Sequence, residues 1–251
     1  MRAGRAVEIS VSPLFSLLQK ENLGEPHTIF AGGERYFSPR FSRVAAEVFR
    51  RELAEAGLGN EADYLDFVDM VGVVQRATTE FYGWVTGVDE HYGILVASHG
   101  RHAVSLRRSG DSVSFERCDA ERTLDTLVAN LPDVPAGQGD AISVSHADFH
   151  AGSRAPGSVM RRSSAARPEA ARRLDALLDV RRRFVTKIYA AKKDDQGVRT
   201  RSSRWVTVLD LVDGRWVLSV GQSRQERWIR VAPGTPRLIS DRLSELARTV
   251  R

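Results

Sequence analysis

The sequence has little cysteine and no long apolar run. Among its 251 residues Cys118 is the one cysteine, which excludes an internal disulfide and a zinc site built from cysteines. No stretch of about eighteen consecutive apolar residues is present, so the sequence offers no membrane-spanning helix. The first residues contain arginines but no apolar stretch ending in a small-residue cleavage site, which argues against a signal peptide. We therefore expect a cytoplasmic globular protein.

Motifs for nucleotide binding and for nucleophilic catalysis are missing as well. The sequence has no Gly-x-x-x-x-Gly-Lys loop and no Gly-x-Gly-x-x-Gly after a strand. It has no Gly-x-Ser-x-Gly elbow, and Cys118 has no evident histidine partner. We expect no cofactor and no enzymatic activity.

Lysine is scarce, although the chain is basic. The net charge is +5 and the isoelectric point is about 9.7, yet lysine occurs only at positions 20, 187, 192 and 193. The densest basic cluster consists of arginines at 161, 162, 167, 172, 173, 181, 182 and 183. The favoured interpretation is a solvated arginine-rich face whose aliphatic stems cover apolar neighbours. The alternative is an arginine-rich nucleic-acid-binding protein, for which affinity would fall steeply with salt.

What the sequence does contain is a pattern of helices and strands that occurs twice. Helical spacing of apolar residues predicts helices over 40–57 and 62–77, a helix after Asp119, a helix over 169–180 and a last helix opened by Pro236. Alternating patterns predict two sets of four short strands. The first set is FYGWVTG, GILVAS, HAVSLRR and SVSFER, and the second is RRFVTKIYAA, RWVTVLDLV, RWVLSV and RWIRVA. Each set precedes a helix.

This order indicates an internal duplication. Aligning Gly100 with Gly214, an offset of 114 residues, matches HGRHAVSL with DGRWVLSV and places a glycine turn in each copy. We expect Trp205 and Trp216 to fill the core of the duplicated sheet. The predicted fold class is α+β, with pseudo-twofold duplicated antiparallel β-sheet units flanked by helices. The whole chain, 1–251, forms one domain whose halves, about 7–145 and 169–250, are joined by a mobile linker over 146–168.

The stretch that begins that linker resembles a metal site. In HADFH, the side chains of His146, Asp148 and His150 would share one face of a strand, where three ligand types could converge. Because the stretch runs into a Gly/Ser/Pro-rich segment, a solvated strand end is favoured and no metal is expected. A metal-dependent hydrolase centred on these residues is a further alternative.

Taken together in order, these segments resemble the EspG family of actinobacterial proteins associated with ESX, or type VII, secretion. The resemblance runs from about Val7 to Val250. It is carried by VEISV, FRRELAEAGL, the first sheet FYGWVTG…YGILVASHGRHAVSLRR, the stretch LDTLVANLPDVPAG, the second sheet beginning RRRFVTKIYAA, and RWIRVAPGTPRLISDRLSEL. The most telling pieces are Asp210 followed by Gly214-Arg215-Trp216, and the Val-Ala-Pro before the last helix.

The resemblance implies a non-enzymatic cytosolic chaperone that binds the helical tip of a PPE protein in a PE–PPE heterodimer and keeps it soluble for export. The client would be that heterodimer or a similar helical secretion substrate, with no membrane and no nucleic acid as partner. The free chaperone would be a monomer or a weak homodimer. The implied partner-binding residues are Val88, Asp89, Glu90 and His91 in a strand–strand loop and Leu174, Leu177, Leu178 and Arg181 in the helical region.

Overall fold

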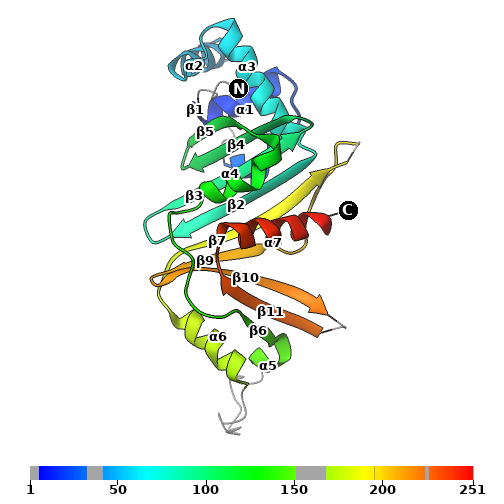
Figure 1. The fold of residues 1–251 in the computed structure, drawn as a ribbon. Helices are drawn as coiled ribbons and strands as arrows, with labels where there is room; N and C mark the ends of the chain where they lie inside the picture. Colours follow the sequence, from blue (N-terminus) through cyan, green and yellow to red (C-terminus); the bar gives the residue numbers. More distant parts are fainter. Residues whose placement is uncertain (1–5, 33–41, 151–167, 195, 224–225, 251) are drawn as a thin grey trace, which may run out of the picture.

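One antiparallel sheet runs the length of the molecule (Figure 1). The computed structural model describes residues 6–32, 42–150, 168–194, 196–223 and 226–250, and within these ranges eleven strands form that sheet. Across the sheet the order is β1 (Val7–Ser10), β5 (Ser112–Cys118), β4 (His102–Ser109), β3 (His91–His99), β2 (Thr79–Gly87), β7 (Arg182–Lys193), β9 (Val206–Leu211), β10 (Gly214–Ser223), β11 (Glu226–Pro233) and β6 (Ile142–Ser145). The remaining strand, β8 (Arg199–Arg201), pairs with the end of β7.

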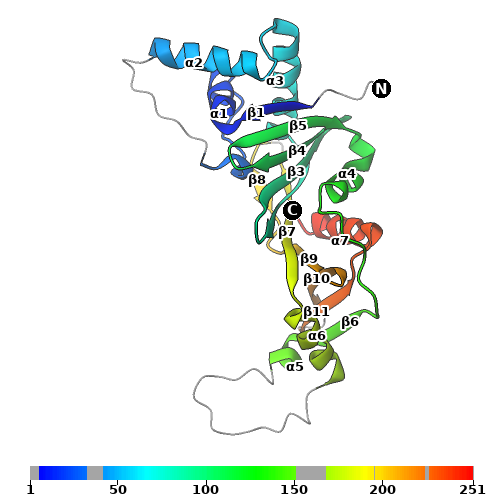
Figure 2. The same cartoon turned by 90° about the vertical axis from the view of Figure 1, so that its left-hand side faces the viewer.

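The helices cover the two faces of the sheet unequally (Figures 1 and 2). They are α1 (Val11–Lys20), α2 (Ser42–Glu55), α3 (Glu61–Gln75), α4 (Thr123–Ala129), α5 (His146–His150), α6 (Glu169–Asp179) and α7 (Pro236–Arg248), with 3-10 turns η1 (Thr28–Phe30) and η3 (Ala120–Arg122). In both views α4 and α7 lie over the middle of one face. The other face carries α1 and α3 near one end and α5 and α6 near the other. None of the described helices is long and apolar enough to cross a membrane.

The predicted duplication is visible in the strand order. Strands β2 and β7 lie side by side at the centre, and β3, β4 and β5 follow on one side as β9, β10 and β11 do on the other. Helix α4 follows β5 just as α7 follows β11. The two halves are therefore related by a pseudo-twofold axis at the β2–β7 pair, and the predicted fold class is confirmed.

The predicted offset of 114 fits the second hairpin of each half, where Ser109 pairs with Ser112 and Ser223 with Glu226, but it is wrong by two residues at the first hairpin. In the first half Gly100 and Arg101 form the turn between paired His99 and His102, and Gly100 has φ +60°. In the second half the turn is Val212–Asp213 between paired Leu211 and Gly214, so Gly214 is the first strand residue after the turn, at φ +133°. The two glycines both need positive φ but do not occupy equivalent places, because the second turn lies two residues earlier in the aligned sequence.

The last strand of the predicted first half pairs with a strand of the second half. Strand β6, within the predicted first half, pairs with β11. The first five residues of the predicted linker, 146–150, form the helical turn α5. Residues 151–167 lie outside the described residues.

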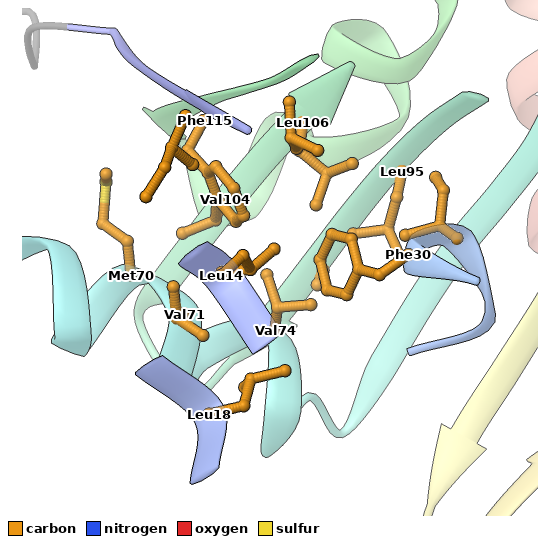
Figure 3. Close-up of a cluster of buried hydrophobic side chains, with 14 of the residues drawn as sticks. Leu14, Leu18, Phe30, Met70, Val71, Val74, Leu95, Val104, Leu106 and Phe115 are labelled. Atoms are coloured by element: carbon orange, nitrogen blue, oxygen red, sulfur yellow. The ribbon is translucent and has the colours of Figure 1, made fainter. Parts of the chain in front are cut away.

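Three hydrophobic clusters hold these layers together. One packs α1, α3 and η1 against β2 to β5, and Figure 3 shows part of it, with Leu14 and Leu18 of α1 facing Val71 and Val74 of α3 near Phe30, Val104 and Phe115. A second lies between the middle of the sheet and helices α4 and α7. The third packs α6 and Phe149 of α5 on β6, β9, β10 and β11.

A buried polar group ties the N-terminal segment to the sheet at its centre. The His27 ring is fully buried, and its Nδ1 accepts the backbone N–H of Ile29 at 3.0 Å. A neutral ring that accepts at Nδ1 carries its proton on Nε2, which then donates to Glu80 Oε1 at 3.2 Å. The same carboxylate oxygen lies 2.9 Å from Arg199 Nε on β8. Burial holds the pKa of His27 below its ordinary value, although Glu80 opposes this shift.

We therefore expect the protein to lose stability as the pH falls below about 6.5, the ordinary pKa of histidine. Below that pH the unfolded chain binds a proton at His27, whereas the folded chain does not until the pH is lower still. The free energy of unfolding therefore decreases as the pH is lowered, by up to about 1.4 kcal/mol per pH unit. Urea unfolding between pH 7.5 and 5 measures the slope. His27→Gln should flatten it, whereas His102→Gln, at an exposed histidine, should leave it unchanged. A slope equal in all three proteins would contradict this assignment.

Candidate functional site

No helix among the described residues covers the middle of the sheet face opposite α4 and α7. On β7, Val185 packs with the α6 cluster and Ala191 with the α1–α3 cluster, and both point to this face. Lys187 and Tyr189 lie between them on the same face. Figure 2 shows this stretch of sheet without a helix on the side where α1 and α5 lie. The described helices thus leave part of the sheet open between two sets of helices.

Aromatic side chains line this open stretch, and we name Trp84, His91, Tyr189 and Trp205 the aromatic strip. His91 stacks on Trp84 with ring centroids 5.4 Å apart, and Tyr189 lies 5.9 Å from Trp205. Lys187 Nζ lies 5.5 Å from the Trp205 ring centroid and, in the strand register, is opposite Trp84. Trp205 is 42% exposed, a large value for the largest apolar side chain. His91 is exposed as well, whereas Trp84 and Tyr189 are half-buried against the α1–α3 cluster. A group of aromatic rings that reaches solvent in this way is typical of a contact surface.

A cavity of about 480 Å³ adjoins the strip. Its floor includes Thr207, Leu218 and Val220, which lie on the same face as α6, and Lys187, Arg204 and Arg227 bring positive charge to it. The other lining residues are Ser203, Trp205, Gly221 and Gln222. Among the described residues that line the cavity none is acidic, so it suits an apolar group flanked by negative charge.

The prediction that both tryptophans fill the core holds for one of them. Trp216 is 5% exposed within the α6 cluster, and Gly137 of the segment that follows α4 lies against its ring. Trp205 instead precedes β9 and stays partly exposed. The Ser202-Ser203 pair just before it, where Ser202 Oγ donates to the Arg204 carbonyl at 2.7 Å, was the local signal that the strand starts later.

The predicted loop site is a tight hairpin turn at the tip of β2 and β3. The Gly87 amide donates to the Glu90 carbonyl at 2.7 Å, so Val88 and Asp89 form the turn. Val88 is 80% exposed, Asp89 and Glu90 are exposed, and His91 belongs to the aromatic strip. An apolar side chain at the tip of a turn has no structural reason to be there.

The predicted helical site divides into buried and exposed residues. Leu174 and Leu177 are buried against the sheet, at 0% and 9% exposure, and hold α6 in place. Leu178 is half-buried and Arg181 is exposed just beyond the end of α6. The partner role of these residues stays a prediction, and its accessible members are Leu178 and Arg181.

The structure brings the predicted loop site and the predicted helical site to the same end of the central strands β2, β7 and β9. We call this end of the strands the edge of the site. Gly87, next to Val88, is opposite Phe184 near the start of β7, and Leu211 is opposite Arg182. The Val212 amide donates to the Arg181 carbonyl at 3.1 Å, and the Val212 side chain is 58% exposed. Val212, which the sequence analysis missed, adds a second exposed apolar residue at this edge. Its position in a turn, where polar residues dominate, was the available signal.

The described arginines of the basic cluster do not form one surface built for phosphate. Arg161, Arg162 and Arg167 lie outside the described residues. Of the others, Arg173 donates to the Asp140 carbonyl at 3.4 Å and Arg182 to the Leu178 carbonyl at 3.0 Å, so both hold local backbone. Nothing in the described part of the chain favours the nucleic-acid alternative.

The HADFH stretch is a helical turn, so the expectation that His146, Asp148 and His150 share a strand face is wrong. Helical spacing brings His146 and His150 together and turns Asp148 elsewhere. No group of three metal-ligand side chains occurs among the described residues, which leaves the hydrolase alternative without support. Cys118 is no candidate nucleophile either, because burial raises its pKa to about 11.

The fold and the open face define a class of protein: a duplicated antiparallel sheet with an exposed aromatic surface suited to holding another chain. The EspG family model matches residues 10–245, so the chain belongs to the EspG family. Among solved structures it is similar to the Mycobacterium tuberculosis type VII secretion system chaperone EspG5, solved in complex with the PE25–PPE41 dimer. The TM-score is 0.65 at 14% identity, over 98% of this chain and 97% of that one. A search of curated proteins finds no match.

Proposed function

We propose that this chain is a cytosolic chaperone of type VII secretion that holds the helical tip of a PPE-like protein within a PE–PPE pair. The observation that carries the proposal is the exposed aromatic strip beside an apolar-floored cavity, in a member of the EspG family. A helical tip that exposes apolar residues would aggregate if it were left in water. The strip offers rigid aromatic area at little cost in side-chain entropy. The similar EspG5 chaperone was solved with a PE–PPE dimer.

In this proposal the client lies across the open face and reaches the edge formed by Val88 to His91, Leu178 and Arg181. Leu174 and Leu177 support that edge from beneath. The cations at the cavity, Lys187, Arg204 and Arg227, favour clients with acidic residues beside the apolar tip. No step of this role requires catalysis or a cofactor.

Co-expression of the tagged chain with a PE–PPE-like pair encoded beside its gene tests the proposal directly. We expect a stoichiometric complex that survives washing at high salt, because apolar burial is little screened by ions. Recovery of nucleic acid that is released as salt rises would instead support the arginine-rich alternative and contradict the chaperone role.

Replacing Trp205 with alanine should weaken client binding by about 30-fold or more, which corresponds to the loss of a hot-spot aromatic. The fold should tolerate the change because the side chain is already 42% exposed. Titration of the purified chain against the PE–PPE pair by calorimetry measures the effect.

Leu65→Ala is the matched control, since Leu65 is 54% exposed but lies on α3, away from the open face. Val88→Asp tests the hairpin edge separately and should cost at least about tenfold in affinity, because a buried unpaired carboxylate is expensive. If Trp205→Ala and Val88→Asp bind like Leu65→Ala, the client does not use this face.

A further inference from the structure

Helical turn α5 holds two imidazoles at chelating distance. His146 and His150 are four residues apart, so they extend from the same face of the turn. Their Nε2 atoms lie 3.1 Å apart and their ring centroids 4.2 Å apart. Each ring therefore points the nitrogen that is farther from its own backbone at the other.

That separation is a hydrogen-bond distance between the two rings, and it is also a distance that a shared metal ion allows. A metal–nitrogen bond is about 2.0–2.1 Å long, so two nitrogens bound to one ion at angles between square and tetrahedral lie about 2.9–3.4 Å apart. We propose that His146 and His150 form a bidentate site for a divalent transition metal, of the class Cu²⁺, Ni²⁺ or Zn²⁺. Imidazole nitrogen suits these ions, whereas Mg²⁺ and Ca²⁺ take oxygen ligands.

The turn that carries the site is anchored to the rest of the fold. Ser145, buried at the end of β6, accepts the Asp148 amide on its Oγ at 3.0 Å and so fixes the start of the turn. Phe149 packs against the hydrophobic cluster beneath α6, and its ring also meets that of His150 edge-on at 5.2 Å. Both histidines keep some contact with solvent, so an ion has access to them. Metal binding therefore restricts only the two imidazole side chains, because the fold already fixes the backbone that carries them.

The number of ligands decides which metal binds best. The described residues offer no third histidine, cysteine or carboxylate that completes a cluster, so the other positions on the ion belong to water. Two nitrogens are too few for a closed structural zinc site. With the same ligands, Cu²⁺ binds more tightly than Ni²⁺ or Zn²⁺. Arg227, whose positive charge acts on His146, opposes any cation that arrives there.

Titration of the full-length chain with Cu²⁺ by calorimetry tests the site, with electron paramagnetic resonance to count the bound nitrogens. We expect one ion per chain in a signal that contains two imidazole nitrogens. His146→Gln and His150→Gln should each lower affinity at least about tenfold and leave a one-nitrogen signal or none. Arg227→Gln should raise the affinity, because it removes a like charge.

The matched control is the double change His99→Gln with His102→Gln, which removes another exposed histidine pair, opposite each other across the β3–β4 turn. It should leave the two-nitrogen signal intact. The proposal is overturned if this control abolishes the signal, or if His146→Gln and His150→Gln bind copper as the unchanged chain does. All these side chains are accessible, so circular dichroism should show every variant folded.

Discussion

Replacing Asp210 with asparagine is expected to lower the free energy of unfolding by about 3–5 kcal/mol, the cost of leaving a buried charge unpaired. Asp210 is fully buried and accepts two hydrogen bonds from Arg215, at 2.6 Å from Nε and 3.0 Å from the terminal nitrogen. Without the carboxylate charge, the Arg215 side chain, only 6% exposed, loses the counterion beside it. Guanidinium unfolding monitored by tryptophan fluorescence measures the change.

The effect should be large because Arg215 also fastens the connection between the halves. Its guanidinium donates to the Pro132 carbonyl at 2.5 Å, and its backbone amide donates to the Pro135 carbonyl at 2.7 Å. Its carbonyl accepts the amides of Gly137 and Gly234. Arg215 therefore holds the segment that leaves α4 and crosses to β6 on β10 (Figure 1).

Arg117→Gln is the control, since it breaks arginine–carboxylate pairs of similar length at the surface. Arg117 lies 2.8 Å from Asp66 and 2.9 Å from Asp69, but those carboxylates are 64% and 52% exposed. Exposed pairs contribute about 1 kcal/mol or less. The double change Asp210→Leu with Arg215→Met should recover part of the loss, because it removes both charges. Equal effects of Asp210→Asn and Arg117→Gln would show that the buried pair is not what holds the connection.

The architecture could be predicted from the sequence because it depends on periodicity and order. Period-two patterns predicted the two sets of four strands, helical stripes predicted α2, α3, α6 and α7, and their repetition predicted the duplicated sheet. The position of the first hairpin turn in each half could not be predicted in the same way. Two offsets that differ by two residues place the same side chains on the same face, so the apolar pattern cannot distinguish them.

The open face escaped prediction for a related reason. Trp205 and Trp216 follow the same kind of pattern, and what separates them is cover supplied from far along the chain. Gly137 and α6 close over Trp216, whereas nothing among the described elements covers Trp205. Leu174 and Leu177 show the converse case, because the sequence predicted a partner contact and the structure buries them against the sheet. Their helical spacing predicts an apolar face of the helix, but it does not predict whether that face packs on the sheet or on a partner. Alternation identifies a face, and only the assembled fold says whether the face is buried.

The largest backbone effect is expected where the two halves meet, on replacing Gly83 with alanine. Gly83 lies in β2 opposite Ile188 of β7, and a Cβ added there would fall far inside contact distance of the Lys187 backbone carbonyl. A backbone carbonyl in a paired strand cannot turn aside as a side chain can, so β2 and β7 must separate. Overpacking of this kind costs about 1–3 kcal/mol and, against rigid backbone, more. Chemical denaturation measures the loss, and hydrogen exchange should show it concentrated in the amides of β2 and β7.

Gly221→Ala is the matched control, because Gly221 also lies within a strand, β10, but a Cβ there would meet nothing within 4 Å. It should stabilise the protein slightly, by about 0.4–1 kcal/mol, since alanine restricts the unfolded chain. If both alanines had the same effect, close approach at the β2–β7 seam would not be what requires glycine at position 83. If Gly83→Ala lowers the free energy of unfolding and Gly221→Ala raises it, then the close spacing of β2 and β7, which leaves no room for a side chain at position 83, is required for the two halves to pair.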